Sequence, residues 1–584
     1  MRTAARASLV LLALVLPFEP RQPLAHIGPL ELTLVELALY VAIALGGAAI
    51  AVDLARAGGR IAWRDAARRH AVAIAWLLAL ALSAAAADFA RADALKFALR
   101  AAGGIALYVV AAASLRAPAA ALAVAAAIVA GATVAALAMC PEIHVAGAGA
   151  ALAPFHPLTF QVLGLPRASG PFQYPNIAAM YLEAALPLAI AVGTAVDGRR
   201  RAAGHAHAIA GSIAGTVVAV VLAYALSLTA SRAATVTAGV VLLGAAAYAR
   251  WRRAPSRWPA VAALAAIVMV AAIAATTGPL GGLRMKFWKD AVWYRSQIVP
   301  VAPFVASVAA GATTTVDVDV TNTGARAWPA LGEHRVALSY HWLDAATGRS
   351  AAFEGERTAL PRDVPPGDGV RVHALVVAPD SPGRYRVQLQ MVHEGITWFS
   401  EQGDAGYQAV VDVLPTVAPA APPPPAPATE VAAPEPQSAA PRALLWRAAV
   451  RAWRDHPLTG LGPDNFRRAY GSYIGLANPD TRLHANNLYL ETLASLGMAG
   501  IAALLLTIVW FWRAGRRALR VHGAATPAGL LAAGACAALV AYLVHGFVDY
   551  FLEFTPTYAL LWLLGGMLTG LGGEQRPHPA PLSS

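Results

Sequence analysis

Long apolar blocks constrain this chain more than any other feature. The stretches 71–87, 118–139 and 257–277 contain almost no charged residue. A helix that crosses a bilayer needs about 20 predominantly apolar residues. By this criterion the sequence predicts a mostly α-helical polytopic membrane protein with about twelve transmembrane helices. They are expected near 8–20, 30–54, 70–88, 95–114, 118–139, 176–196, 206–229, 234–250, 257–277, 486–512, 526–548 and 555–573.

The basic residues indicate how these helices are oriented. The formal net charge of +12 could suggest a nucleic-acid partner, but the arginines gather in the loops 56–69, 199–201, 250–257 and 513–520. With both termini in the cytoplasm all four clusters are cytoplasmic, as the positive-inside rule requires. We therefore expect no nucleic-acid partner, and we expect segments 140–175, 229–233, 278–485 and 549–555 on the outer side.

The segment 300–414 changes from helical blocks to short alternating runs separated by Gly and Pro turns. This pattern predicts an extracytoplasmic β-sandwich of about 100 residues, and it resembles the Ig-like, tryptophan-rich modules that are appended to many proteins. Trp328, Trp342 and Trp398 are expected in its core rather than stacked on sugars. The triplet Asp317-Val318-Asp319 is interpreted as strand alternation and not as a metal-binding motif. Cys140 and Cys536 lie on different spans, so no disulfide or thiol-metal site is predicted.

The chain is thereby divided into consecutive regions. Residues 442–456 place Leu445, Trp446, Ala449, Val450 and Trp453 at helical spacing between arginines, which predicts an amphipathic helix in the membrane interface. The predicted regions are 1–282 (N-terminal transmembrane), 283–299 (interfacial), 300–414 (sandwich), 415–441 (Pro/Ala-rich linker), 442–485 (periplasmic loop with the amphipathic helix), 486–573 (C-terminal transmembrane) and 574–584 (cytoplasmic tail).

His484 lies directly before an apolar run that can cross the bilayer. A side chain that titrates near neutrality at a membrane mouth is a candidate general base, although it could also only anchor the helix. Because successive spans cross the membrane in opposite directions, Arg167, Arg232 and Arg442 are expected on the same outer face as His484. Guanidinium groups match phosphate oxygens and are costly at a membrane mouth unless an anion binds there. Interfacial snorkelling is the alternative for these arginines.

Four blocks, in order, resemble the O-antigen ligase and O-antigen polymerase family of bacterial envelope glycosyltransferases. They are GPFQYPNIAAMYL (170–182), LTASRAATVTAG (228–239), RALLWRAAVRAWRDHPLTGLGPDNF (442–466) and LHANNLYLETLASLGMAG (483–500). Two positions depart from the family pattern: Ala233 replaces a glycine after the Ser-Arg pair, and Ala485 separates His484 from Asn486. The inserted sandwich is not general in the family either.

The resemblance implies transfer of a glycan from an undecaprenyl-pyrophosphate donor to an acceptor hydroxyl, at the periplasmic face of the bacterial inner membrane, with no metal and no cofactor. His484 would act as general base, and Arg232, Arg442 and Arg167 would bind the pyrophosphate. Asn486, Asn487, Asn176 and Asp549 are possible accessory residues. Asp549 and Glu553 could orient the acceptor or the histidine, but structural pairing with loop arginines is the role we expect for both.

Several alternatives remain open at this point. The acceptor could be lipid A core, which defines a ligase, or a growing polysaccharide, which defines a polymerase. A transporter of lipid-linked glycans is a second class, but the polar signals lie at span ends and no internal repeat is visible. A third hypothesis makes the sandwich the functional part. Arg284, in a segment that repeats the Arg-x-x-x-Trp spacing, competes with Arg442 as the second phosphate ligand.

Overall fold

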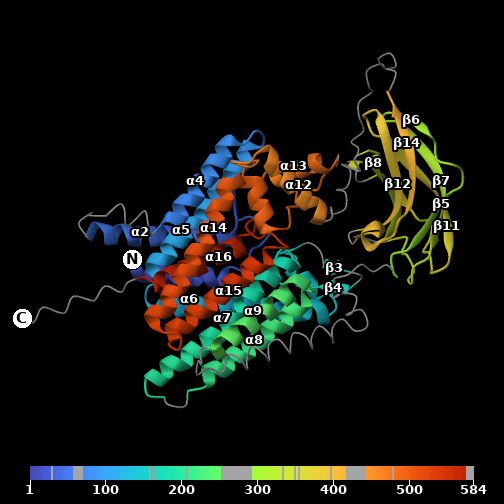
Figure 1. Ribbon diagram of the computed structural model, residues 1–584. Helices are drawn as coiled ribbons and strands as arrows, with labels where there is room; N and C mark the ends of the chain where they lie inside the picture. The colour runs from blue at the N-terminus through green and yellow to red at the C-terminus, as the bar shows by residue number, and fades with distance from the viewer. Residues whose placement is uncertain are drawn as a thin grey trace, which may run out of the picture.

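The computed structural model describes residues 1–27, 30–56, 70–156, 160–162, 165–205, 208–251, 292–331, 335–346, 350–352, 355–394, 397–415, 442–475 and 479–573. Figure 1 shows a helical bundle and, beside it, a separate body of β-strands. Helices α12 (Arg442–Asp455) and α13 (Phe466–Ile474) lie on the side of the bundle that faces the strands. The predicted combination of a helical membrane protein with an inserted β region is therefore confirmed.

Seven helices of the described chain are long and apolar enough to cross a membrane: α2 (Leu34–Arg56), α5 (Arg91–Ser114), α6 (Pro118–His144), α7 (Pro175–Ala202), α8 (Ala210–Leu228), α14 (Leu488–His522) and α15 (Pro527–His545). Shorter apolar helices are α4 (Ala71–Ala86) and the part 232–247 of α9 (Arg232–Trp251). Helices α1 (Arg2–Val15) and α16 (Thr555–Leu571) complete the bundle. The protein is thus a multi-pass membrane protein. The predicted count of about twelve spans is not confirmed, and the predicted span 257–277 lies outside the described residues.

Helix α7 is the most enclosed helix of the bundle, with 94% of its apolar window buried. It packs against α6, α8, α9 and α15. Its contact with α8 is close because Gly193 of α7 meets Gly211 and Gly215 of α8, and a Cβ on any of them would overlap the other helix. Small residues allow such close approach between membrane helices. Helix α7 is therefore closely packed against α8, and its first turn carries the candidate site residue Asn176.

Contacts between helix ends define two opposite ends of the bundle. At one end Arg2 forms an ion pair of 2.9 Å with Asp53, and the guanidinium of Arg6 donates to the carbonyl oxygen of Ser114. The arginine-rich end of α14 lies at this end too, because His522 contacts the Leu571 carbonyl oxygen at 3.0 Å. We call the opposite end, which carries Arg167, Asn176, His484 and Asp549, the site end. This arrangement agrees with the alternation predicted from the positive loops.

Helix α14 is broken near its start, at Gly497, where φ is 61° and ψ is −156°. The segment 457–462 lies against this break and exchanges backbone hydrogen bonds with it. Leu461 N donates to Ala494 O at 2.9 Å and Met498 N donates to Pro457 O at 2.9 Å, with two further bonds from Gly462 and Ala499. Gly460 and Gly462 also have positive φ, so the glycines of the segment 457–462 and of α14 allow the two backbones to approach closely. This contact places Asp464, two residues after the segment, at the site end.

The β region consists of two sheets around one apolar core. The first sheet has the order β10-β8-β12-β14-β6, with β9 and β13 at its sides, and the second has the order β11-β7-β5. All pairings are antiparallel except that of β14 with β6. The strands are β5 (Ser296–Pro300), β6 (Ser307–Ala309), β7 (Thr313–Asn322), β8 (Val336–Asp344), β9 (Ser350–Ala352), β10 (Thr358–Ala359), β11 (Gly369–Val377), β12 (Gly383–His393), β13 (Thr397–Trp398) and β14 (Tyr407–Leu414).

The side chains of this β region follow the predicted alternation. Trp328, Trp342 and Trp398 are all buried. Trp328 and Trp342 lie in the core as expected, whereas Trp398 is buried in a separate small cluster with Ala337 and Val392. Asp317 and Asp319 lie on one face of β7 and pair with His373 and Arg371 of β11, at 2.6 and 2.8 Å. Because cross-strand partners account for both carboxylates, the DxD triplet is a product of strand alternation. The Ig-like identity of the module stays a prediction.

One boundary differs from the predicted regions. Strand β5 begins at Ser296 and pairs with β7, so the sandwich starts before the predicted boundary at 300. Helix α12 confirms the predicted helix, and its buried face, which includes Leu445 and Ala449, packs against α13 and α14. Trp446 and Trp453 are half-buried. The linker 416–441, the segment 283–291 with Arg284 and Trp288, and the tail 574–584 lie outside the described residues. Two short hairpins, β1 (Ala25–Ile27) with β2 (Leu30–Leu32) and β3 (Phe160–Val162) with β4 (Leu165–Arg167), complete the described strands.

Candidate functional site

A continuous set of hydrogen bonds joins three of the predicted residues at the site end. Arg167, the last residue of β4, donates through Nη2 to the Asn176 side-chain oxygen at 2.7 Å and through Nε to the Thr229 carbonyl oxygen at 2.7 Å. Asn176 donates in turn to Oδ2 of Asp549 at 2.8 Å. Asp549 follows α15, so segments from four parts of the sequence meet here. Through Asn176, Asp549 is linked to the guanidinium of Arg167.

Arg232 and Arg442 begin α9 and α12, respectively, and both side chains are exposed. Their positive charges interact with each other, and the charge of Arg442 also acts on His545 at the end of α15. Arg232 follows Thr229, the residue that accepts from Arg167, within one turn. The three predicted arginines therefore surround one region of the site end. Two cations held near each other attract an anion strongly, because an anion relieves their mutual repulsion.

His484 lies in the segment before α14 and is only 5% exposed. Three carboxylates surround its ring. Nε2 lies 2.8 Å from Oε2 of Glu553 and 3.8 Å from Oδ1 of Asp464, and Nδ1 lies 3.4 Å from Oε1 of Glu491. The ring of Tyr550 contacts the imidazole with a centroid distance of 4.8 Å. Tyr550 directly follows Asp549, so the arginine-linked set and the histidine cluster adjoin each other.

The carboxylates set the protonation state of His484. Burial by itself would lower the pKa of His484, but the negative charges of Glu553 and Glu491 outweigh burial and raise this pKa well above its ordinary value. Burial opposes ionisation of Glu553, yet the positive charges of His484, Arg100 and Arg467 lower the pKa of this carboxyl. At neutral pH the two side chains therefore form an imidazolium–carboxylate pair. Glu553 thus pairs primarily with His484 rather than with a loop arginine as expected.

The segment around His484 is fixed by its own hydrogen bonds. Asn487 caps α14, because its side-chain oxygen accepts from Tyr489 N at 3.0 Å and Leu490 N at 2.9 Å. Its amide group donates to the Phe547 carbonyl oxygen at 2.7 Å, which ties the α15–α16 connection to this turn. Asn486 has φ of 47°, a left-handed conformation that asparagine tolerates better than most residues. Both asparagines thus shape the turn that presents His484.

Glu491, Asp464 and Tyr550 belong to the cluster but were not predicted from the sequence. Glu491 accepts from Ala485 N at 2.8 Å and from the Ser495 hydroxyl at 2.9 Å, so it also holds the turn. An acidic residue inside an apolar run is a functional signal, and that signal could have identified Glu491. The same signal applies to Glu183 of α7, which contacts Nδ1 of His545 at 2.9 Å with both side chains buried.

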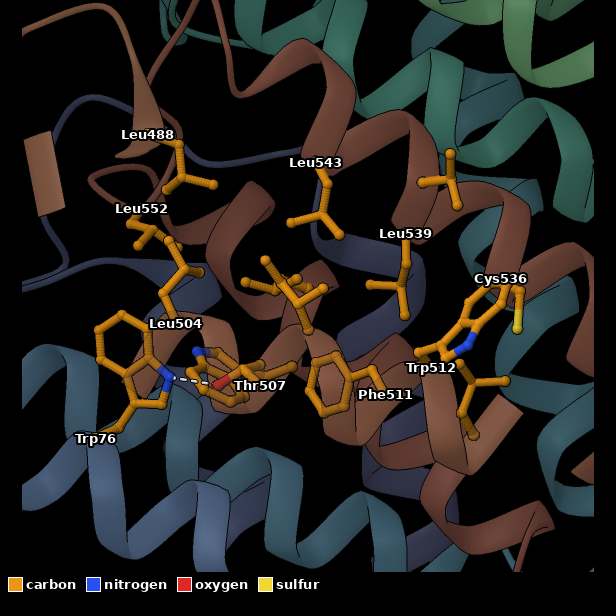
Figure 2. A pocket seen from close by; sticks show the side chains of 15 residues that line it. Trp76, Leu488, Leu504, Thr507, Phe511, Trp512, Cys536, Leu539, Leu543 and Leu552 are labelled. Atoms are coloured by element: carbon orange, nitrogen blue, oxygen red, sulfur yellow. Dashed lines mark hydrogen bonds between the residues drawn. The ribbon is translucent and has the colours of Figure 1, made fainter. Parts of the chain in front are cut away.

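An apolar cavity of about 190 Å³ lies between α4, α14, α15 and α16. Figure 2 shows Leu488, Leu539 and Leu543 around it, with Trp76 donating to the Thr507 hydroxyl at 2.7 Å. A smaller cavity of about 40 Å³ shares its lining residues Trp76, Leu552 and Trp562 and is also lined by Asp464, Glu491 and Tyr550. The apolar cavity therefore adjoins the histidine cluster. Within the part of the chain that the structure describes, no group of three or more His, Cys, Asp or Glu residues is arranged so that it could hold a metal ion.

The fold and this polar cluster define a multi-pass membrane protein with a charged site at one end of its helices. Residues 399–505 match the model of a family described as O-Antigen ligase, a family of glycosyltransferase-like enzymes. The match begins in the β region and ends in α14, and it includes His484. The predicted resemblance to the O-antigen ligase family is therefore confirmed over this part of the chain.

Other comparisons add little. No curated protein matches the chain. Among solved structures the chain is similar to the Pseudomonas fluorescens alkylpurine DNA glycosylase AlkC bound to DNA containing an abasic site analog. The identity is 10%, the similarity covers 59% of this chain and 97% of that chain, and the TM-score is 0.18. A TM-score this low carries no argument about fold or function.

Proposed function

We propose that the protein is a membrane glycosyltransferase of the O-antigen ligase type. It transfers a glycan from an undecaprenyl-pyrophosphate donor to an acceptor hydroxyl, of lipid A core or a similar molecule, at the periplasmic face of the inner membrane. The family match over 399–505 and the multi-pass bundle support this proposal. The observation that carries it is the convergence of Arg167, Asp549 and His484 at the site end, through the bonds of Asn176 and the ring contact of Tyr550.

The arginines supply the donor site in this proposal. Pyrophosphate is a good leaving group, so the enzyme mainly has to stabilise the negative charge that develops as the glycosidic bond breaks. Arg232 and Arg442 bind this pyrophosphate, and Arg167, held by Asn176 and Thr229, borders the same region. The apolar cavity beside the histidine cluster is suited to the hydrocarbon chain of the donor.

The histidine cluster supplies the acceptor site. The acceptor hydroxyl attacks the anomeric carbon in one displacement, which inverts that centre, and its proton leaves into the cluster around His484. His484 carries a proton at neutral pH and lies between carboxylates, so the cluster acts as a unit in this step. Fixed charges in a buried site need no reorganisation during the reaction.

The proposal is tested with purified protein in proteoliposomes and a purified undecaprenyl-pyrophosphate-linked glycan. The wild type is expected to form a glycosylated acceptor and undecaprenyl pyrophosphate, and His484→Ala is expected to insert normally but to transfer no glycan. Loaded lipid A core indicates a ligase, whereas a ladder of lengthening lipid-linked glycans indicates a polymerase. Movement of the intact donor across the bilayer with no joined product would overturn the enzyme proposal in favour of a transporter.

A further inference from the structure

The cluster at the site end contains more carboxylates than the proposed transfer requires, and their environments differ. The side chains of Glu491 and His484 are 1% and 5% exposed, and that of Asp464 is 10% exposed. Glu553 is 29% exposed and is the nearest of the three carboxylates to Nε2 of His484. Glu553 is therefore the most exposed of the three carboxylates around His484.

The two other carboxylates have structural partners. Asp464 forms an ion pair of 2.8 Å with Arg467, three residues later in the chain. Glu491 accepts from the backbone of Ala485 and from the hydroxyl of Ser495 at 2.8 and 2.9 Å. Both carboxylates thus hold the segments that surround the site. The described contact of Glu553 with His484 is made through Oε2, and a carboxylate offers two oxygens with several acceptor positions.

We propose, on the basis of the function proposed above, that Glu553 accepts the proton of the acceptor hydroxyl and that His484 is the positioning residue that holds Glu553. In this step the hydroxyl oxygen forms a bond to the anomeric carbon while its proton passes to Glu553. The bond between the anomeric carbon and the phosphate oxygen breaks, and its electron pair leaves with the pyrophosphate, whose charge the arginines bind. The products are the glycoside, the polyprenyl pyrophosphate anion and a protonated Glu553.

Charged groups from several elements act on Glu553 and favour its ionised form. The cations are His484 from the segment before α14, Arg467 from α13 and Arg100 from α5. The carboxylates of Asp464 and of Glu491 in α14 oppose this effect, and the neutral groups nearby are Tyr550, which lies between α15 and α16 as Glu553 does, and Tyr174 before α7. Arg100 itself is surrounded by Glu19, Glu36 and Tyr558. The balance lowers the pKa of Glu553 and raises that of His484. Glu553 is therefore ready to accept a proton at neutral pH, whereas His484 is not.

The pH dependence of the chemical step separates the two groups. If Glu553 is the base, the single-turnover rate stays flat between about pH 6 and 8 and falls as the pH drops toward the carboxyl range, because the base must be ionised. If His484 is the base, the rate rises with pH through this interval, because only the unprotonated imidazole reacts and its pKa is raised well above 6.5. The second result would overturn the inference.

The matching substitution is Glu553→Gln, which keeps the shape of the side chain and removes its basicity. It is expected to lower the single-turnover rate about 10²- to 10⁴-fold, with little change in donor binding. Asp93→Asn is the control, because Asp93 is a partly exposed carboxylate of the same end that pairs with Arg468 at 3.0 Å. This control is expected to retain wild-type activity. Folding of both variants is compared by thermal unfolding in detergent. The pH profile of the wild type tests the same inference without any substitution.

The outcomes also separate this inference from the proposed function. A wild type that transfers no glycan from the lipid-linked donor refutes the function itself. A wild type that transfers glycan, together with a folded Glu553→Gln variant of normal rate, refutes only the role of Glu553. In the expected case His484→Gln reacts slowly. As the pH is lowered, its rate begins to fall at a higher pH than the wild-type rate does, because Glu553 has lost the imidazolium that lowers its pKa.

Discussion

Substitution of Gly497 by alanine should damage activity more than stability. At this residue φ is 61° and ψ is −156°, a conformation that costs a non-glycine residue about 1–3 kcal/mol. A Cβ on Gly497 would also lie 2.5 Å from the carbonyl carbon of Leu458, which belongs to backbone and cannot rotate away. The segment 457–462 must therefore shift, even if its four hydrogen bonds to α14 survive.

The shift is expected to reach the site, because Asp464 follows this segment and lies 3.8 Å from His484. A misplacement of about 1 Å in a catalytic site can reduce a rate about 100-fold. We therefore expect Gly497→Ala to lose about 1–3 kcal/mol of stability and about 100-fold in transfer rate. Loss of all four backbone hydrogen bonds would cost more, at about 0.5–1.5 kcal/mol each.

Thermal unfolding in detergent and the proteoliposome transfer assay measure the two effects. Gly47→Ala in α2 is the control, because a Cβ at this position meets nothing within 4 Å. Alanine there should leave activity unchanged and stabilise the helix by up to about 1 kcal/mol. Wild-type activity in Gly497→Ala would refute the argument that the break in α14 positions the site.

Three further substitutions test other parts of the account. Arg232→Ala should weaken donor binding by 10-fold or more, because a charged hydrogen bond contributes about 1.5–3 kcal/mol; unchanged binding in a fluorescence titration would contradict a donor site at this residue. Val540→Trp, which fills part of the apolar cavity, should raise KM for long-chain donors more than for short-chain donors, whereas Leu505→Trp on an exposed face should change neither value. Asn487→Ala should lower the free energy of unfolding by about 0.5–2 kcal/mol through loss of the α14 cap, and a stability equal to that of the wild type would argue against this cap.

Local patterns predicted much of this architecture because they are short-range. Apolar runs predicted the helices, alternation predicted the strands around Trp342, and apolar residues at helical spacing between arginines predicted α12. The motif blocks predicted a resemblance to the O-antigen ligase family, and the match over residues 399–505 confirms it for that part of the chain. The number of spans was less accessible, since the length of an apolar run does not show where a helix breaks or ends.

The composition of the histidine cluster could not be predicted in the same way. Glu491 is seven residues from His484, but Asp464 and Glu553 reach it from other segments, and only the docking of 457–462 on the break of α14 brings Asp464 close. The pKa of His484 depends on this assembly, because burial alone would lower it and the charges of Glu553 and Glu491 raise it. Long-range contacts of this kind have no signature in a single sequence.

The central claim is that the arginines and the histidine cluster form one site with separate tasks. It is tested most directly by measuring donor binding and single-turnover transfer in parallel for Arg232→Ala and His484→Ala. The account predicts that Arg232→Ala loses donor affinity, and that His484→Ala binds donor with wild-type affinity but forms almost no product. Normal transfer by either folded variant would contradict it.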